Sequence, residues 1–214
     1  MIRIGLLSIV AAALWPCVLA AQSPEAPNDG VQVGDRWVYD TKDEITGFPK
    51  ETYTQIVTEA SPKEIVTSLT FRGKNGSTLV VFNRDWGVLD NAIWKFAPNN
   101  GQGIPSALAV GKEWHSEYQS RNRQNGTNLK GSSLSKVVAQ ESITTSGGTF
   151  DTFKIERQWR ELNASDPSKF FEGLTVMWFA PQINHWVRRT FLVKFEKRTR
   201  SNTSEELVDF SRNL

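Results

Sequence analysis

Apolar and polar residues alternate along most of this chain with a period of two. Over residues 152–160, Phe153, Ile155 and Trp159 share one face, which Arg157 interrupts, and polar side chains occupy the other. This alternation is typical of a half-buried β-strand. No long segment shows the 3.6-residue period of an amphipathic helix. The pattern predicts strands at residues 33–41, 51–60, 64–72, 77–84, 86–96, 112–123, 129–144, 149–162, 170–180, 185–198 and 204–212.

Turn residues separate these runs. They are rich in Gly and Asn, which supply the positive φ angles that tight hairpins require. Clear examples lie at 73–76, 125–126, 147–148, 163–168 and 181–184. Short strands joined by hairpin turns predict an all-β fold. We expect an antiparallel sandwich, or a strongly curved, partly open barrel, of about ten strands with little helix.

Two apolar segments and one long connection refine this prediction. Residues 79–82 and 174–179 are apolar on both faces, which is typical of a central strand or of a strand whose second face is covered. Residues 97–110 lack a strand pattern. We expect them to cross between two parts of one core, with one helical turn at 106–109.

The N-terminal residues 1–21 resemble an export signal. Arg3 provides the positive start, 4–14 form an apolar run too short to span a bilayer comfortably, and 18–20 end in the small residue that signal peptidase needs. Pro16 breaks the run. We therefore predict cleavage at the end of this segment and a periplasmic or secreted protein with no transmembrane segment.

The predicted domain limits follow from this signal. Residues 1–21 are the signal peptide, and the Pro-, Asn- and Asp-rich residues 22–32 form a flexible leader. A single β domain occupies 33–214, with possible halves at 33–96 and 111–214.

Cysteine usage agrees with this reading of the N-terminus. Cys17 is the only cysteine, and it lies inside the signal. Signals of bacterial lipoproteins carry small residues directly before the anchored cysteine, whereas Trp15 and Pro16 stand there. We therefore expect no lipid anchor and, in the mature chain, no disulfide and no Cys-bound metal.

Charge is nearly balanced. The formal net charge of the 214 residues is +2, and loss of Arg3 with the signal lowers it to +1. No global field therefore points to a nucleic-acid partner. Residues 188–200 are locally basic and interleaved with apolar residues. We interpret them as a solvated strand face, with a patch for anionic lipid headgroups as the weaker alternative.

Signatures of catalysis are absent from the sequence. The chain has two histidines, His115 and His185, and lacks the metalloprotease, nucleophile-elbow and phosphate-loop motifs. His115 lies near Glu117, so a His–carboxylate pair is conceivable. His185 follows a turn and is predicted to be a surface residue. We assign no catalytic residue, no metal ligand and no cofactor.

Tryptophan is the one residue type with functional potential here. Four tryptophans are expected to anchor the core, namely Trp37, Trp114, Trp159 and Trp178. Two others stand beside turn residues, where an exposed indole could stack on a ligand. Together with the segments that are apolar on both faces, these two give the predicted ligand-contacting set: Val80, Phe82, Val176, Phe179, Trp86 and Trp94.

A series of short landmarks runs through the mature chain in a fixed order. They are GDRWVY at 34–39, VGKEW at 110–114, GTFDTFKI at 148–155, WFAP at 178–181 and WVR at 186–188. The series resembles the TapB-like family of secreted bacterial β-proteins of unknown function. The resemblance implies an exported, largely antiparallel β domain with no established catalytic residues.

Three functions remain open from the sequence. The first is a non-enzymatic cell-envelope protein that binds a lipid or another apolar or amphipathic ligand inside a curved sheet. The second is an accessory or assembly protein that docks on another envelope protein through an open sheet edge. The third, and least favoured, is a hydrolase whose site is assembled from distant strands.

Overall fold

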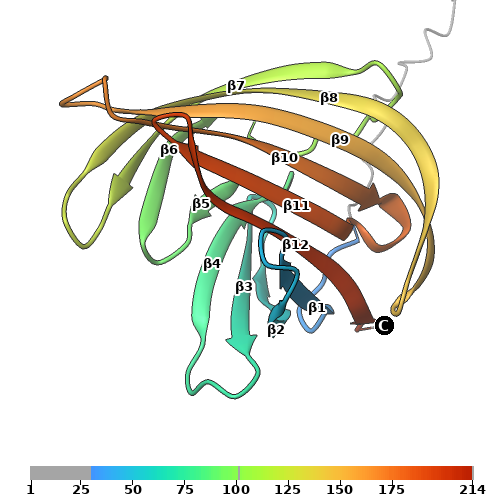
Figure 1. Cartoon of the computed structure of the whole chain (residues 1–214). Helices are drawn as coiled ribbons and strands as arrows, with labels where there is room; N and C mark the ends of the chain where they lie inside the picture. The colour runs from blue at the N-terminus through green and yellow to red at the C-terminus, as the bar shows by residue number, and fades with distance from the viewer. Residues whose placement is uncertain (1–29, 101, 214) are drawn as a thin grey trace, which may run out of the picture.

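Twelve antiparallel strands close into a barrel in the computed structural model, which describes residues 30–100 and 102–213 (Figure 1). Each strand pairs with its neighbours in the chain, and β1 also pairs with β12. The strands are β1 (Arg36–Asp43), β2 (Pro49–Ala60), β3 (Glu64–Phe71), β4 (Thr78–Asn83), β5 (Val88–Asp90), β6 (Trp94–Asn100), β7 (Glu113–Asn122), β8 (Asn128–Thr145), β9 (Gly148–Asn163), β10 (Phe170–Ala180), β11 (His185–Phe195) and β12 (Arg198–Ser211).

The all-β prediction is confirmed, but the predicted sandwich or partly open barrel of about ten strands is wrong. Closure depends on β1 and β12, which are paired from Arg36↔Ser211 to Asp43↔Thr203. Alternation and turn residues report only on local structure, so they carry no trace of a pairing between the two ends of the chain. A closed barrel leaves no free strand edge in the described part of the chain.

The strand count differs from the prediction because one predicted strand forms two separate strands in the structure. Residues 86–96 divide into β5 and β6 at a turn in which the Asn91 side chain accepts from the N–H groups of Ile93 and Trp94. Ala92 adopts a φ of 69° there. The β11–β12 hairpin also turns earlier than predicted, at Glu196 and Lys197, which have φ angles of 49° and 67°.

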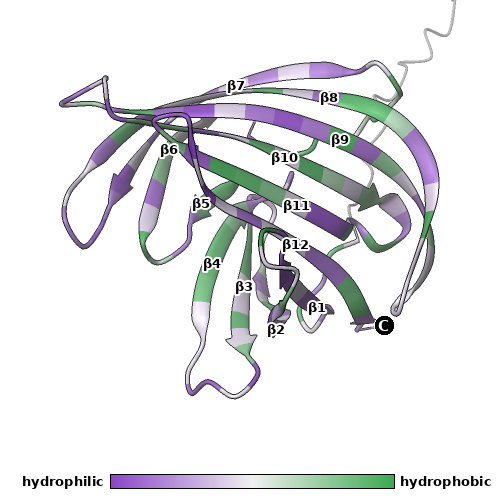
Figure 2. Ribbon diagram, viewed as in Figure 1, coloured by the Kyte–Doolittle hydropathy of each residue, from purple (hydrophilic) through white to green (hydrophobic). Residues whose placement is uncertain are grey.

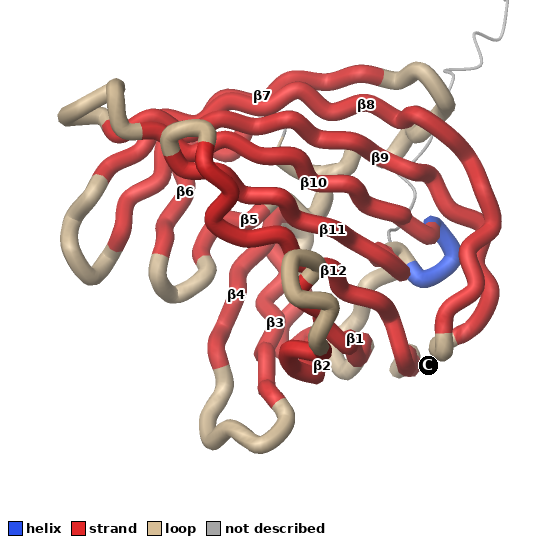
Figure 3. The backbone as a smooth tube through the Cα atoms, viewed as in Figure 1, coloured by secondary structure: helices blue, strands red, loops and turns tan. Residues whose placement is uncertain are grey.

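Helix is nearly absent, as predicted, but its location differs. Figure 3 shows the only helical turn of the described residues, the 3₁₀ segment Pro181–Ile183, between β10 and β11. Residues 106–109, predicted to form one helical turn, are irregular. Val31, placed by sequence in the flexible leader, is buried in the core.

Exposed and buried residues alternate over the first ten residues of β8, and Figure 2 shows bands of polar and apolar residues along the long strands. On β8 the inward positions from Leu129 to Val137 include glycine and serines. Small inward residues leave room for rings from neighbouring strands. A Cβ on Gly131 would lie 2.2 Å from the Tyr118 ring, and one on Gly173 would lie 2.5 Å from the Trp159 ring.

Candidate functional site

The barrel interior holds two voids that adjoin each other. The larger, of about 420 Å³, is lined by residues of β4 to β11, and the smaller, of about 320 Å³, by residues of β1 to β5, β11 and β12. Both volumes lie in or near the range of small-molecule sites. The two linings share Phe82, Val88, Trp186, Arg189 and Phe191.

Aromatic side chains dominate the apolar part of the larger void. Alternation along β9 turns Arg157, Trp159 and Glu161 inward, and the other strands add further rings. Trp86 is held by a bond from its indole N–H to the Asn184 carbonyl (2.8 Å) and adopts a φ of 61°. The rings of this void include Phe82, Trp86, Phe96, Trp159, Trp186 and Phe191.

Arg157 is a half-buried cation that lines the larger void. Its Nε donates to the Ser135 hydroxyl (3.0 Å) and its Nη2 to the Gly103 carbonyl (3.1 Å). Burial lowers the pKa of the guanidinium to about 10, so it stays charged at neutral pH. No carboxylate of the described residues forms an ion pair with it.

The connection between β6 and β7 enters the interior beside Arg157. Gln102 and Ile104 line the larger void, and the Gly103 carbonyl also accepts from the Trp114 indole (3.1 Å). A Cβ on Gly103 would lie 2.4 Å from the Asp85 carbonyl oxygen, so only glycine fits. Part of the predicted crossing segment therefore lines the interior.

Arg189 stands where the two voids meet. Its Nε and Nη2 each lie 2.6 Å from Glu205 Oε1, and the Tyr53 hydroxyl donates to the other carboxylate oxygen (2.8 Å). The guanidinium also lies over the rings of Trp186 (3.7 Å) and Phe191 (4.4 Å). Glu205 therefore neutralises Arg189, and the pair is fixed by stacking on both sides.

A second carboxylate faces the larger void on β9. The Tyr118 hydroxyl donates to Glu161 Oε1 (2.8 Å). Burial raises the pKa of Glu161, although the bond from Tyr118 opposes this shift. Burial and the nearby Glu161 raise the pKa of Tyr118. The pair is therefore a hydrogen-bonded polar feature of the lining.

His185 is fully buried, which corrects the predicted surface location. Its imidazole stacks on Trp37 (4.3 Å between centroids), and its Nδ1 lies 2.5 Å from the Tyr39 hydroxyl. The residue opens β11 directly after the turn, and the first three residues of this strand are all buried. Burial, with a contribution from Arg189, lowers the pKa of His185 well below its usual range, so the ring is neutral.

Acid should therefore destabilise the protein through His185. The folded state keeps the ring neutral while the unfolded chain protonates it below about pH 6.5. The free energy of unfolding should fall with decreasing pH in this window, by up to about 1.4 kcal/mol per pH unit from this group. Urea unfolding between pH 7 and 5 should show a shallower fall in His185→Gln. The exposed His115, changed to Gln, is the matched control; an unchanged slope in His185→Gln would contradict the assignment.

The predicted ligand-contacting residues divide between the voids and other places. Val80 lines the smaller void, Trp86 the larger and Phe82 both. Phe179 is buried in the core but outside both linings, and Trp94 is half-buried outside them. Val176 lies on the outward face of β10, opposite Thr190 of β11 and Glu156 of β9.

Four tryptophans were predicted to anchor the core, and they differ in burial. Trp37 is fully buried, whereas Trp114, Trp159 and Trp178 are only half-buried. Trp178 lies on the outer face, where its indole donates to Glu141 (2.5 Å) and its ring is approached by Lys154. Its prediction as a buried anchor is wrong because the apolar second face of β10 points outward.

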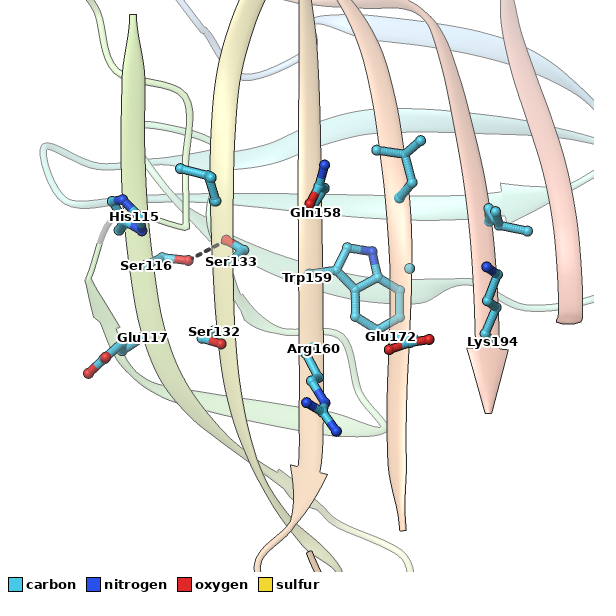
Figure 4. Close-up of a pocket in the computed structure, with 14 residues that line it drawn as sticks. His115, Ser116, Glu117, Ser132, Ser133, Gln158, Trp159, Arg160, Glu172 and Lys194 are labelled. Carbon is cyan, nitrogen blue, oxygen red and sulfur yellow. Dashed lines mark hydrogen bonds between the residues drawn. The ribbon is translucent and has the colours of Figure 1, made fainter. Parts of the chain in front are cut away.

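The outer face of β7 to β11 carries a groove of about 600 Å³ (Figure 4). Strand register sets its side chains in two rows. One row is largely neutral: His115, Leu134, Gln158, Leu174 and Leu192. The next is mostly charged: Glu117, Ser132, Arg160, Glu172 and Lys194. The hydrogen bond between Ser116 and Ser133 (2.7 Å) lies on the opposite, inward face.

Polar interior residues are what the sequence analysis missed. Arg189, Glu161 and Glu205 were not singled out, because on their own strands they look like ordinary polar positions. Arg157 left a visible signal, since it interrupts an otherwise apolar strand face. No group of three or more His, Cys, Asp or Glu side chains gathers within 30–100 and 102–213. No helix in that part of the chain is long and apolar enough to cross a membrane.

Comparisons with known proteins relate the chain to solved structures through its fold. A hypothetical lipoprotein from Parabacteroides distasonis superposes with a TM-score of 0.56 at 14% identity, covering 84% of this chain and 96% of that one. A hypothetical exported protein with a YmcC-like fold from Bacteroides fragilis superposes with a TM-score of 0.53 at 16% identity, covering 85% of this chain and 97% of that one. The hypothetical lipoprotein YmcC from Escherichia coli superposes with a TM-score of 0.51 at 8% identity, covering 85% of this chain and 90% of that one. The likeness is one of fold.

No family model matches the chain, and no curated protein matches its sequence. The comparisons therefore show that this chain shares its all-β fold with the exported protein and the lipoproteins named above. They do not extend to the TapB-like family, which stays a prediction from the sequence landmarks.

Proposed function

We propose that this protein is an exported, non-enzymatic binder of an amphipathic small molecule, which it holds inside its barrel. The observation that carries the proposal is the pair of adjoining voids in the interior. Both voids are partly open to solvent, so a small molecule can enter them, and their volumes lie in the range of ligand sites. A ligand with an apolar body and a polar head matches a lining of rings interspersed with polar groups.

Small inward residues support this proposal. On β7 and β8 the positions that face the interior include Ser116, Gly131, Ser133 and Ser135. A barrel selected only for stability would fill such positions with larger apolar side chains. Of these positions, Ser133 lines the larger void, whereas the space at Gly131 is taken by the Tyr118 ring.

The interior carboxylates favour binding over hydrolysis. Glu205 is held by Arg189 and Tyr53, and Glu161 accepts from Tyr118. Each carboxylate is thus committed to a fixed partner. Docking on a partner protein through a sheet edge, the second function considered above, has no free edge to use in the closed barrel. The periplasm or the cell exterior is the proposed location, in line with the exported proteins that share the fold.

Filling the larger void should abolish binding. Thr175 lines this void from β10, and its neighbour Val176 faces outward on the same strand. N-phenyl-1-naphthylamine, a neutral probe that fluoresces in apolar surroundings, should bind the unaltered protein at one site. We expect Thr175→Phe to weaken its affinity at least about tenfold, which corresponds to about 1.4 kcal/mol.

Val176→Phe is the matched control and should retain the affinity. Urea unfolding checks that both variants fold, and Ser133→Phe repeats the test from β8 if Thr175→Phe does not. Equal affinity in a folded, void-filled variant, or no binding by the unaltered protein, would contradict an interior site.

A further inference from the structure

Arg157 is a positive charge of the larger void that no carboxylate among the described residues pairs with. Of the two guanidinium groups that line the larger void, Arg189 is paired with Glu205 at 2.6 Å. Arg157 has only neutral partners, the Ser135 hydroxyl and the Gly103 carbonyl. Arg157 is half-buried and lines the void, so its charge is only partly hydrated and remains available to an anion there.

Hydrogen-bond counting leaves Arg157 with free donors. A guanidinium has five N–H groups in a fixed fork. Two of them are used, by Ser135 and by Gly103, and three have no partner among the described residues. The bond to the Gly103 carbonyl fixes the β6–β7 connection. A neutral amide side chain at position 157 could donate the same bond, so this bond does not require a positive charge. The charge itself is therefore unexplained by the protein's own contacts.

No other group in the larger void takes the place of a counter-ion. Glu161, two positions beyond Trp159 on β9, forms no ion pair with Arg157 and is engaged by Tyr118. Arg189 is close enough to lower the pKa of Arg157. The field in the void is thus positive around Arg157.

The surroundings of Arg157 define what an anion there would have to carry. Rings of Trp86, Trp159 and Trp186 line the same void. A bound anion therefore needs an apolar body of moderate size behind its charged group. A fork of free N–H groups from a single arginine suits a planar carboxylate, which accepts two parallel bonds.

We propose that the ligand of the barrel is a carboxylic acid with a hydrocarbon body, bound as the carboxylate to the free N–H groups of Arg157. This inference rests on the proposed function and makes it specific. The acid enters as the ionised species at neutral pH, and no bond is made or broken. Rings of the larger void cover the hydrocarbon part.

Displacement of N-phenyl-1-naphthylamine by three ligands of one chain length tests the inference. Decanoate, decanol and decylammonium differ only in the head group. At pH 7.5 we expect decanoate to bind about 10- to 100-fold more tightly than decanol, the range for a hydrogen-bonded charged pair, and decylammonium to bind least. Arg157→Gln should remove this preference, while affinity for decanol stays within about threefold.

Arg160→Gln is the matched control, because Arg160 lies on the outward face of the same strand. It should keep the full preference for decanoate. If Arg157→Gln does not fold, Arg157→Lys should retain a reduced preference, because one ammonium cannot make two parallel bonds.

The outcomes separate the two proposals. Equal binding of decanoate and decanol would overturn the carboxylate site and leave the amphipathic binder standing. A preference for decanoate that survives in folded Arg157→Gln would overturn the role of Arg157. Failure of every ligand and of the probe to bind the folded protein would overturn both.

Discussion

Replacing Trp37 with alanine should lower the free energy of unfolding by about 3–5 kcal/mol, the range for truncating a buried aromatic residue. Trp37 is fully buried on β1, stacks on His185 at 4.3 Å, and meets Trp86 edge to face at 5.7 Å. Its loss would open a large cavity at the centre of the aromatic cluster. Urea unfolding monitored by circular dichroism measures the change.

Trp178→Ala is the matched control for Trp37. The same side chain is removed, but from the outer face of β10, where the ring is half-buried among charged residues. We expect a cost of at most about 1–2 kcal/mol. Equal costs for the two variants would show that the inward and outward faces have been misassigned.

Replacing Glu205 with alanine should also lower the free energy of unfolding by about 3–5 kcal/mol. The variant leaves Arg189 without its counter-charge in the interior and removes the acceptor of the Tyr53 hydroxyl. The two charged side chains are well covered, with exposures of 19% for Arg189 and 8% for Glu205. Solvent therefore replaces the lost pairing only in part.

Glu113→Ala is the control for this ion pair. Glu113 pairs with Lys136 at 2.8 Å, but both side chains are about half exposed, at 48% and 50%. Exposed pairs of this kind contribute little to stability, because water screens them. If Glu205→Ala costs no more than Glu113→Ala, the interior is wetter than the structure indicates, and the argument from burial fails.

Local features of the fold could be predicted from the sequence, and its closure could not. The alternation over β9 and the turns at 125–126 and 147–148 are encoded within a few residues, so their strands were located well. The β1–β12 pairing joins segments about 170 positions apart. The turn at Glu196 and Lys197 was missed because neither residue is typical of positive φ.

The candidate site was predictable only in its apolar part. Val80, Phe82 and Trp86 were selected for hydropathy or for their place beside a turn, and they do line the voids. The polar part depends on partners from distant strands. Tyr53 meets Glu205 across 152 positions, which no local pattern reveals.

Arg157 was visible in the sequence as an exception. A charged residue on the apolar face of a strand is usually read as a break in the pattern. In a closed barrel the same position points into the interior, and the exception becomes the most informative residue of the site. Its meaning depended on closure, which the sequence did not reveal.

Mass spectrometry of an organic extract tests the central claim most directly. The protein is purified from the envelope of the organism that makes it, without detergent exchange, alongside Thr175→Phe and Val176→Phe. We predict about one carboxylic acid with a hydrocarbon body per molecule of the unaltered protein and of Val176→Phe, and little in Thr175→Phe. An extract without any stoichiometric amphipathic species, from a folded protein that also fails to bind decanoate, would contradict the claim.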